Sequence, residues 1–378
     1  MTALSIVFGF RDRDIKRVER CLASLSQQSF TDFEVLFVDY GSQAQTAQAV
    51  RHIIEKHRFA RYIYTETRGY PWNRSHALNI GGKRARGDYL MTTDVDMIYP
   101  PDFLDVFMAQ AEENLEVHIA PHLLPENFSD WANINAYRGK FETGTTSMRG
   151  ACQMIATRVF HEMRGYDEYY RYYGVEDRDM SIRLRLMGIE EKWLADKTAM
   201  FHQWHPSADY NVRDLIPEGV WGRMEIHFQK QRHQLIRNDD SWGKLHSHEN
   251  RPALRFVDAD NQTLRNCPEL HHVNLPPTEN YAIGTVSKLL REVKSGDALA
   301  INHAFFPKPN PNADKVIKFV NRFFYRWVQG SRIDYPTNSL HNFLVNLIEA
   351  PTPLIADYYL NLPVKNGVSI SCEGITSL

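Results

Sequence analysis

The stretch Tyr89-Leu-Met-Thr-Thr-Asp94-Val95-Asp96-Met97 decides how the rest of the chain is interpreted. An apolar run ends here in two carboxylates that are separated by one residue. Aspartate is depleted in strands, so the pair is expected where a buried strand meets a loop. Alternate residues of an extended chain point the same way, and two carboxylates suit a divalent cation with the phosphates that it carries. A turn that merely contains two aspartates explains the same residues equally well.

On either side of this stretch, the first 120 residues alternate between short apolar runs and segments with apolar residues at helical spacing. The expected strands cover residues 4–8, 34–38, 61–64, 88–93 and 117–120, with helices over residues 15–25, 47–54 and 103–111. This order predicts an α/β domain with a largely parallel sheet flanked by helices. Ligands of such sheets bind beyond the carboxyl ends of the strands, where Asp39 and the Asp94–Asp96 pair are expected.

The later part of the chain is less regular. A polar segment over residues 121–148 precedes expected strands at 151–156, 192–194 and 199–201 and a helix at 176–187. After about residue 210 the pattern loosens into a β-rich stretch at 250–274 and helices at 286–293 and 314–328. We therefore predict one domain over residues 1–210 and an accessory region over residues 211–378 that is mixed or mainly helical.

Composition narrows the class of protein. The 378 residues are 43% hydrophobic and 24% charged, which is typical of a globular protein. The net charge of -2 supplies no global basic field for nucleic acid, so no nucleic-acid partner is expected. Four scattered cysteines and the lack of a basic leader favour a reduced, cytoplasmic protein. Peripheral contact with the inner face of a membrane and the oligomeric state both stay open.

Four polar features follow one another in a definite order. Asp39 closes the second strand, and Asp94-Val-Asp96 closes the fourth. Gly174-Val-Glu176-Asp177 begins a helix, and His202-Gln-Trp-His205 follows the last short strand. Oxygen ligands suit magnesium and manganese, and manganese also accepts imidazole. Acidic residues at a helix start are also common for dipole reasons, and a single histidine more often has a structural role.

With these features in place, residues 1–210 resemble a GT-A glycosyltransferase of the family 2 type. The resemblance rests on Phe33-Glu-Val-Leu-Phe-Val-Asp39-Tyr-Gly-Ser42, on Asn79-Ile-Gly-Gly leading to Asp94-Val-Asp96, and on Gly165-Tyr-Asp-Glu with Gly174-Val-Glu-Asp177. The segment that ends at His205 is similar to the carboxyl-terminal half of chondroitin-polymerising enzymes and β-1,4-galactosyltransferases. The resemblance implies a GT-A catalytic domain over residues 1–210 and does not cover residues 211–378.

The resemblance also implies roles for the carboxylates and histidines. Asp96 would bind Mn²⁺ or Mg²⁺, with His202 and His205 as candidate ligands. His202 ranks first, because chondroitin-polymerase-like enzymes carry a His-Gln pair at that place. Asp177 would be the general base of an inverting transfer, and Glu176 would contact the acceptor.

Other residues would bind the donor, a UDP-sugar. The resemblance implies that Asp39 accepts a hydrogen bond from uracil and that Asp94 contacts the ribose or the water shell of the metal. Phe10 and Arg11, after the first strand, would lie near the nucleotide. The segment before the strand at residues 88–93 would approach the diphosphate and the sugar. Arg74 and Asn79 lie on this segment and are candidate contacts of the donor. Tyr40 stands where the family usually has a second aspartate, which departs from the pattern.

The function implied is transfer of N-acetylgalactosamine, galactose, N-acetylglucosamine or glucuronic acid from a UDP-sugar to a hydroxyl group. The acceptor would be a glycan or a lipid-linked glycan, in surface polysaccharide synthesis. Two alternatives stay open. One is a metal-dependent nucleotidyltransferase. The sequence has neither a P-loop nor a Gly-rich loop near its start, which argues against this alternative. The other is a degenerate, non-catalytic glycan-binding protein. Phe10 and Tyr40 favour this alternative, because both depart from the residues that the family usually has at these positions.

Overall fold

The computed structural model describes residues 2–146, 148–172, 174–194, 200–205 and 220–251, together with four strands between residues 270 and 375. The chain divides into two compact units. The first unit comprises Met1–Val212 and Gly222–Ser247, and the second comprises Arg213–Trp221 and His248–Leu378. The first unit therefore takes in residues beyond the boundary that was predicted near residue 210. Among the described residues, no helix is both long and apolar enough to cross a bilayer.

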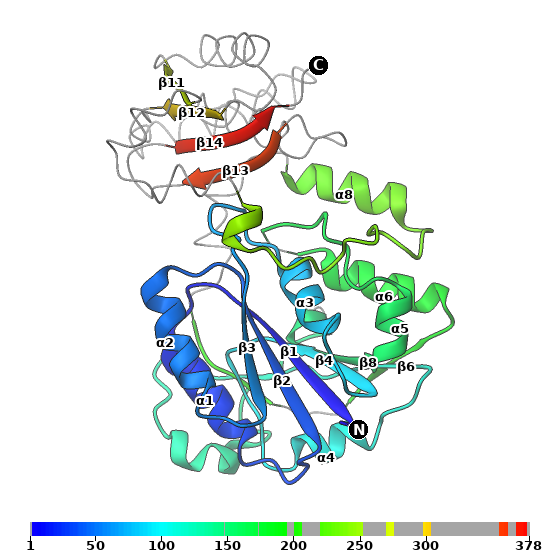
Figure 1. Ribbon diagram of the computed structural model, residues 1–378. Coiled ribbons are helices and arrows are strands. Elements are labelled where there is room, and N and C mark those ends of the chain that lie inside the picture. Colours follow the sequence, from blue (N-terminus) through cyan, green and yellow to red (C-terminus); the bar gives the residue numbers. More distant parts are fainter. Residues whose placement is uncertain are drawn as a thin grey trace, which may run out of the picture. The chain divides into compact units, whose positions relative to one another are not determined.

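A seven-stranded, mostly parallel sheet forms the centre of the first unit (Figure 1). Its strand order is β3-β2-β1-β4-β8-β6-β9, and only the pairings of β8 with β4 and β6 are antiparallel. The strands are β1 (Leu4–Phe10), β2 (Phe33–Asp39), β3 (Ala60–Tyr64), β4 (Tyr89–Thr93), β6 (Leu115–His118), β8 (Cys152–Ala156) and β9 (Glu190–Trp193). The predicted α/β architecture is thereby confirmed.

Helices cover both faces of this sheet. Figure 1 shows α1 (Ile15–Leu25) and α2 (Ala44–Ile54) on one face, and α3 (Arg74–Gly82), α5 (Thr157–Glu162) and α6 (Glu176–Leu186) on the other. Residues alternate along β1, so that Ile6 and Phe8 join the core under α1 while Val7 joins the core under α5 and α6. The first unit also contains α4 (Phe103–Met108) and, from Gly222 onward, α8 (Val220–Gln231).

The sequence pattern did not reveal helix α3. All of its residues except Arg74 are buried, so no polar stripe marks a solvent side. Asn73 caps it by accepting a hydrogen bond from the His76 amide. A Cβ added at Gly81 would lie 2.4 Å from Val7, and one at Gly82 would lie 2.3 Å from Phe160. The two glycines therefore allow α3 to approach the sheet and α5 closely.

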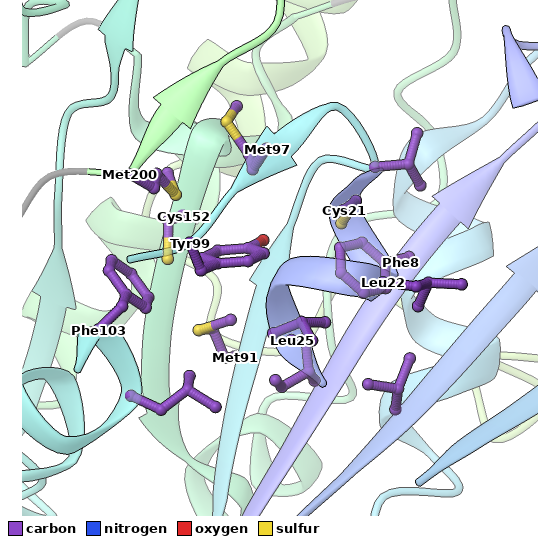
Figure 2. Packing of buried hydrophobic residues seen from close by; sticks show 14 of the residues in the cluster. Phe8, Cys21, Leu22, Leu25, Met91, Met97, Tyr99, Phe103, Cys152 and Met200 are labelled. Atoms are coloured by element: carbon purple, nitrogen blue, oxygen red, sulfur yellow. The ribbon is translucent and has the colours of Figure 1, made fainter. Parts of the chain in front are cut away.

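A small second sheet lies at the carboxyl side of β4. It joins β5 (Met97–Ile98), β10 (Phe201–His202) and β7 (His122–Leu123) in the order β5-β10-β7. Met97 and Met200 belong to the sulfur-rich core around Tyr99, where Figure 2 shows Cys152, Met91 and Phe103 beside the phenol ring. This packing anchors the short strands that follow Asp96 and precede His205.

In the second unit, the described residues form a mixed four-stranded sheet in the order β11-β12-β14-β13. The strands are β11 (Leu270–Leu275), β12 (Ala298–His303), β13 (Ile355–Asn361) and β14 (Val368–Ile375). The sequence indicated β structure only around residues 250–274. The helices expected at residues 286–293 and 314–328 lie outside the described residues.

Candidate active site

The candidate site lies at the carboxyl edge of the parallel strands. Phe10 pairs with Asp39 across β1 and β2, and Phe8 pairs with Thr93 across β1 and β4. The three strands therefore end at the same edge, which is where open α/β sheets bind ligands. The structure places Asp39 at the end of β2 and Asp94 directly after β4, as the sequence predicts.

A pairing between distant segments brings the two histidines to the second aspartate. His202 pairs with Met97 across β10 and β5, and the Gln203 amide donates to the Asp96 carbonyl at 2.9 Å. His205 Nε2 lies 3.1 Å from Asp96 Oδ2, and His202 Nε2 lies 3.7 Å from Asp96 Oδ1. One potential ligand atom from each of the three residues lies within 4.8 Å of the others. His205 is thus the nearer histidine, although the sequence ranks His202 first.

The Asp96 carboxylate is suited to a cation. Its side chain is 15% exposed, and Oδ1 is buried without a hydrogen-bond partner among the described residues. Burial by itself would raise the pKa of Asp96, but the hydrogen bond from His205 and the nearby His202 and Arg13 hold it below its usual value. Manganese accepts a donor set of two imidazoles and one ionised carboxylate whose oxygen lacks a hydrogen-bond partner. These residues fit the metal that the resemblance implies.

Arg74 connects two of the predicted carboxylates. From the first turn of α3, its Nη2 lies 3.2 Å from Asp94 Oδ1 and donates to the Gly150 carbonyl at 2.6 Å. Its Nη1 lies 3.8 Å from Glu176 Oε1 and has no hydrogen-bond partner among the described residues. This buried, unsatisfied donor could serve an anionic ligand, since guanidinium groups bind phosphate oxygens well.

Glu176 and Asp177 open helix α6 in different environments. Glu176 is 8% exposed, and burial followed by the neighbouring Asp177 charge raises its pKa to about 7 against the pull of Arg74. Asp177 is partly exposed, and its Oδ2 accepts the Gly150 amide at 3.1 Å. The helix N-terminus favours negative charge at both residues. The preceding residue, Val175, has a φ of 79°, a strained conformation for a β-branched side chain.

Asp39 is engaged within the protein. Its side chain is fully buried, Oδ1 accepts the Ser42 amide at 2.8 Å, and Oδ2 accepts the Tyr62 hydroxyl at 2.7 Å. Burial raises the pKa of Asp39 despite these hydrogen bonds. Sequence reasoning missed Tyr62, although it lies on the neighbouring strand, two residues before the partner of Asp39.

Three residues expected near the nucleotide make contacts within the protein. Phe10 is fully buried against Phe37, so its ring offers no surface to a ligand. Asn79 is also fully buried, and its amide bonds Tyr166 and Glu168. Both side chains therefore lie in the core, and their contact with the nucleotide stays a prediction. Arg11 donates to backbone carbonyls of three loop residues, Tyr40, Thr67 and Tyr70.

Two tryptophans are related to the candidate metal ligands. Trp204 lies between them in the sequence, and Trp131 is connected to the neighbouring Gln203 through Arg20. Trp204, between the two histidines, is 40% exposed. Trp131, in the 3-10 helix Trp131–Tyr137, lies under the guanidinium of Arg20 at 4.1 Å. Arg20 in turn donates to Gln203 Oε1 at 3.1 Å. The polar segment after residue 121 is therefore tied to the histidine segment.

Two family models match the first unit. Residues 5–167 match glycosyl transferase family 2, and residues 133–206 match the N-terminal domain of galactosyltransferase. Both matches are to the families on which the resemblance in the sequence was based, which is thereby confirmed over residues 5–206. The first match contains Asp39, Asp94 and Asp96, and the second contains Glu176, Asp177, His202 and His205.

Two curated proteins are similar in sequence. An O-antigen biosynthesis protein RfbC of Myxococcus xanthus is 25% identical over 239 residues, which are 57% of this chain and 18% of that protein. An uncharacterized glycosyltransferase of Haemophilus influenzae is 30% identical over 105 residues, which are 28% of this chain and 40% of that protein. The chain thus spans less than half the length of either relative.

Solved glycosyltransferase structures are more distant. The mannosyltransferase PcManGT from Pyrobaculum calidifontis, solved with GDP-Man and Mn²⁺, has a TM-score of 0.43 and 18% identity over 60% of this chain and 63% of its own. S. aureus TarS 1-349 with UDP has a TM-score of 0.42 and 17% identity over 71% of this chain and 81% of its own.

Proposed function

We propose that this chain is an inverting, metal-dependent glycosyltransferase that moves a sugar from UDP to a hydroxyl group of a glycan or lipid-linked acceptor. The observation that carries the proposal is the meeting of two sets of residues at one sheet edge. Asp96, His202 and His205 form one set, and Arg74, Glu176 and Asp177 form the other. Asp94 joins them, because it pairs with Arg74 and lies two residues before Asp96.

Asp96, His202 and His205 would hold the cation. The open Asp96 Oδ1 supports this role, because a buried carboxylate oxygen without a partner is unfavourable unless something binds it. When bound, manganese or magnesium would act as a Lewis acid on the leaving diphosphate. Arg74 Nη1 would donate to a phosphate oxygen of the donor.

Asp177 is the proposed general base. Its carboxylate is partly exposed and held by the Gly150 amide, so it can accept a proton from an acceptor hydroxyl without leaving its place. Glu176 is more deeply buried beside Arg74 and would contact the acceptor. The hydroxyl oxygen would then attack the anomeric carbon on the face opposite the phosphate, which inverts the configuration.

The choice of UDP follows from the resemblance at Asp39. A uracil that bonds this carboxylate must displace the Tyr62 hydroxyl or share its oxygen, because Asp39 is fully buried. The donor nucleotide is therefore the first property to measure. The donor sugar would be N-acetylgalactosamine, galactose, N-acetylglucosamine or glucuronic acid.

A surface polysaccharide is the proposed acceptor class. The similarity to an O-antigen biosynthesis protein supports it. The exposed ring of Trp204, between the two candidate metal ligands, offers an apolar face against which a sugar ring can pack.

The test is a thermal-shift and product-release screen of the full chain with Mn²⁺ against UDP-, GDP- and CDP-sugars. We expect stabilisation by UDP only with the metal, and release of UDP from one UDP-sugar. Release of pyrophosphate would support a nucleotidyltransferase instead. UDP binding without release of UDP from any donor would support the degenerate, glycan-binding alternative.

A further inference from the structure

Glu116 on β6 is a buried carboxylate away from the residues assigned above. Its side chain is fully buried, and Oε1 accepts three hydrogen bonds, from His118 Nε2 at 2.7 Å, Gln153 Nε2 at 2.5 Å and Ser181 Oγ at 2.5 Å. Its other oxygen, Oε2, has no partner among the described residues. Placing a carboxylate in a core is unfavourable, so its three partners point to a specific role.

One of these partners, Ser181, lies on helix α6. Ser181 is 1% exposed and lies four residues after Asp177, one turn along the same face of the helix. Its hydrogen bond to Glu116 joins α6 to the central sheet. The bond therefore restrains the rotation and the depth of the turn that carries Asp177.

A second partner, His118, is connected to Asp177 through Trp193 and the Arg149–Gly150 segment. The His118 ring stacks on Trp193, with ring centroids 4.8 Å apart. The Arg149 guanidinium lies 5.6 Å from the Trp193 ring centroid. Arg149 directly precedes Gly150, whose amide donates to Asp177 Oδ2. Glu116 is thus connected to the donor of this hydrogen bond as well as to the helix that carries its acceptor.

The third partner, Gln153, is connected through hydrogen bonds to β4, the strand that precedes Asp94 and Asp96. The side-chain oxygen of Gln153, Oε1, accepts a hydrogen bond from the Tyr166 hydroxyl, which lies 2.7 Å from Thr92 Oγ1 on β4. Thr92 lies two residues before Asp94. Glu116 is therefore also connected, through Gln153 and Tyr166, to strand β4, which directly precedes the aspartate pair.

We propose that Glu116 is a positioning residue for Asp177: it holds α6 and the Arg149–Gly150 segment in the relation that the Gly150–Asp177 hydrogen bond requires. The assignment rests on the proposed function only in that Asp177 is taken as the base. The structural relation itself can be tested without a substrate.

The substrate-free test follows the Gly150 amide. Full-length chain labelled with ¹⁵N-glycine gives a Gly150 signal that Gly150→Ala identifies, and its hydrogen exchange is measured without nucleotide. In Ser181→Ala and Glu116→Ala we expect this amide to exchange about tenfold faster or more, because its acceptor is displaced. Glu116→Gln keeps an acceptor oxygen without the charge, so an intermediate rate is expected.

Ser24→Ala is the matched control. Ser24 is also a buried helical serine, but it lies on α1, on the other face of the sheet. Its hydroxyl donates to the Cys21 carbonyl and accepts a hydrogen bond from the Tyr99 amide. Its removal is expected to leave Gly150 exchange within about twofold of wild type. Equal acceleration in Ser181→Ala and Ser24→Ala would mean global destabilisation and would overturn the proposal. Ser181→Ala also keeps the test decisive if Glu116→Ala does not fold.

A kinetic measurement separates positioning from donor binding. With the UDP-sugar that wild type turns over, Ser181→Ala and Glu116→Gln should lower kcat about tenfold and leave the donor KM within about twofold. A higher KM with unchanged kcat would contradict positioning of the base. If wild type releases UDP from no donor, the proposed function fails, while the Gly150 exchange rates still decide the role of Glu116.

Discussion

Arg74 Nη1 and Glu176 Oε1 lie 3.8 Å apart, and both side chains are at least 85% shielded from solvent. The guanidinium stabilises the ionised form of Glu176, yet burial and the Asp177 charge prevail and raise its pKa to about 7. A carboxyl group in this state changes charge near neutral pH, which has a measurable consequence for stability.

Glu176→Gln should stabilise the protein only at the higher pH. Because the folded-state pKa lies above the ordinary value of 4.5, the stabilisation by protonated Glu176 is complete below that value and is lost as the pH rises through about 7. Glutamine mimics the protonated form, so the variant should exceed wild type by about 1–3 kcal/mol at pH 8 and match it near pH 4.5. Urea unfolding at both pH values measures this. The exposed Glu126→Gln is the control, and a pH-independent difference for Glu176→Gln would contradict the prediction.

Asp96→Asn should abolish the response to Mn²⁺. The amide removes the negative charge on which the cation depends, so we expect loss of Mn²⁺-dependent thermal stabilisation and a fall in turnover of about 100-fold or more. Differential scanning fluorimetry and UDP release measure the two effects. Asp88→Asn, on the exposed residue before β4, is the matched control. Full metal-dependent activity in Asp96→Asn would remove Asp96 from the site.

His205→Ala and His202→Ala should each weaken Mn²⁺ binding by at least the roughly 10–100-fold that loss of an outer-shell partner costs. Because a ligating imidazole must be neutral, protons compete with the cation, and the affinity of wild type should also fall as the pH is lowered. Isothermal titration with Mn²⁺ gives both results, with the exposed His52→Ala as control. If only one histidine variant loses affinity, the other is a structural neighbour of Asp96.

Val175→Gly should stabilise the fold by about 1 kcal/mol, because a β-branched residue at a φ of 79° is strained and glycine is not. The same change should lower kcat, since the backbone before Glu176 gains freedom. Val175→Ala keeps a Cβ and should recover much less of the strain. Urea unfolding and initial rates measure the effects, and a destabilised Val175→Gly would show that contacts of the valine side chain outweigh the strain.

Asn79→Ala should lower stability by about 2–3 kcal/mol, because it leaves the buried Tyr166 amide without its acceptor. It also removes one of the two donors to the Tyr166 carbonyl and one of the two donors to Glu168 Oε1. In the fraction that folds, the donor KM should match wild type. A raised KM without loss of stability would return Asn79 to the nucleotide site and overturn its structural assignment.

Much of the fold could be predicted because the strands of a sheet covered on both faces are continuous apolar runs. Residues 34–38 and 88–93 were expected as strands and lie within or beside β2 and β4. Pairing direction is not a local property, so the antiparallel insertion of β8 between β4 and β6 could not be foreseen. Helix α3 was not predicted, because a helix that is buried on nearly every side has no amphipathic period in its sequence.

The candidate site shows a similar division. Asp96, His202 and His205 were predicted from motif order, and the structure brings them together. Phe10 was placed by its segment alone, although alternation along β1 puts it on the same side as Ile6 and Phe8, in the core. Gly150 carries no side-chain signal, because its contribution to the site is a backbone amide.

The pairing of β5 with β10 sets an order of events during synthesis. More than one hundred residues separate Met97 from its partner His202. Strands β1 to β4 are complete in a much shorter nascent chain, and closing the long connection carries an entropic penalty that only later contacts offset. A ribosome-bound fragment ending before His202 would therefore carry the aspartates without their imidazoles. The proposed cation site would therefore be complete only once residue 205 has left the exit tunnel.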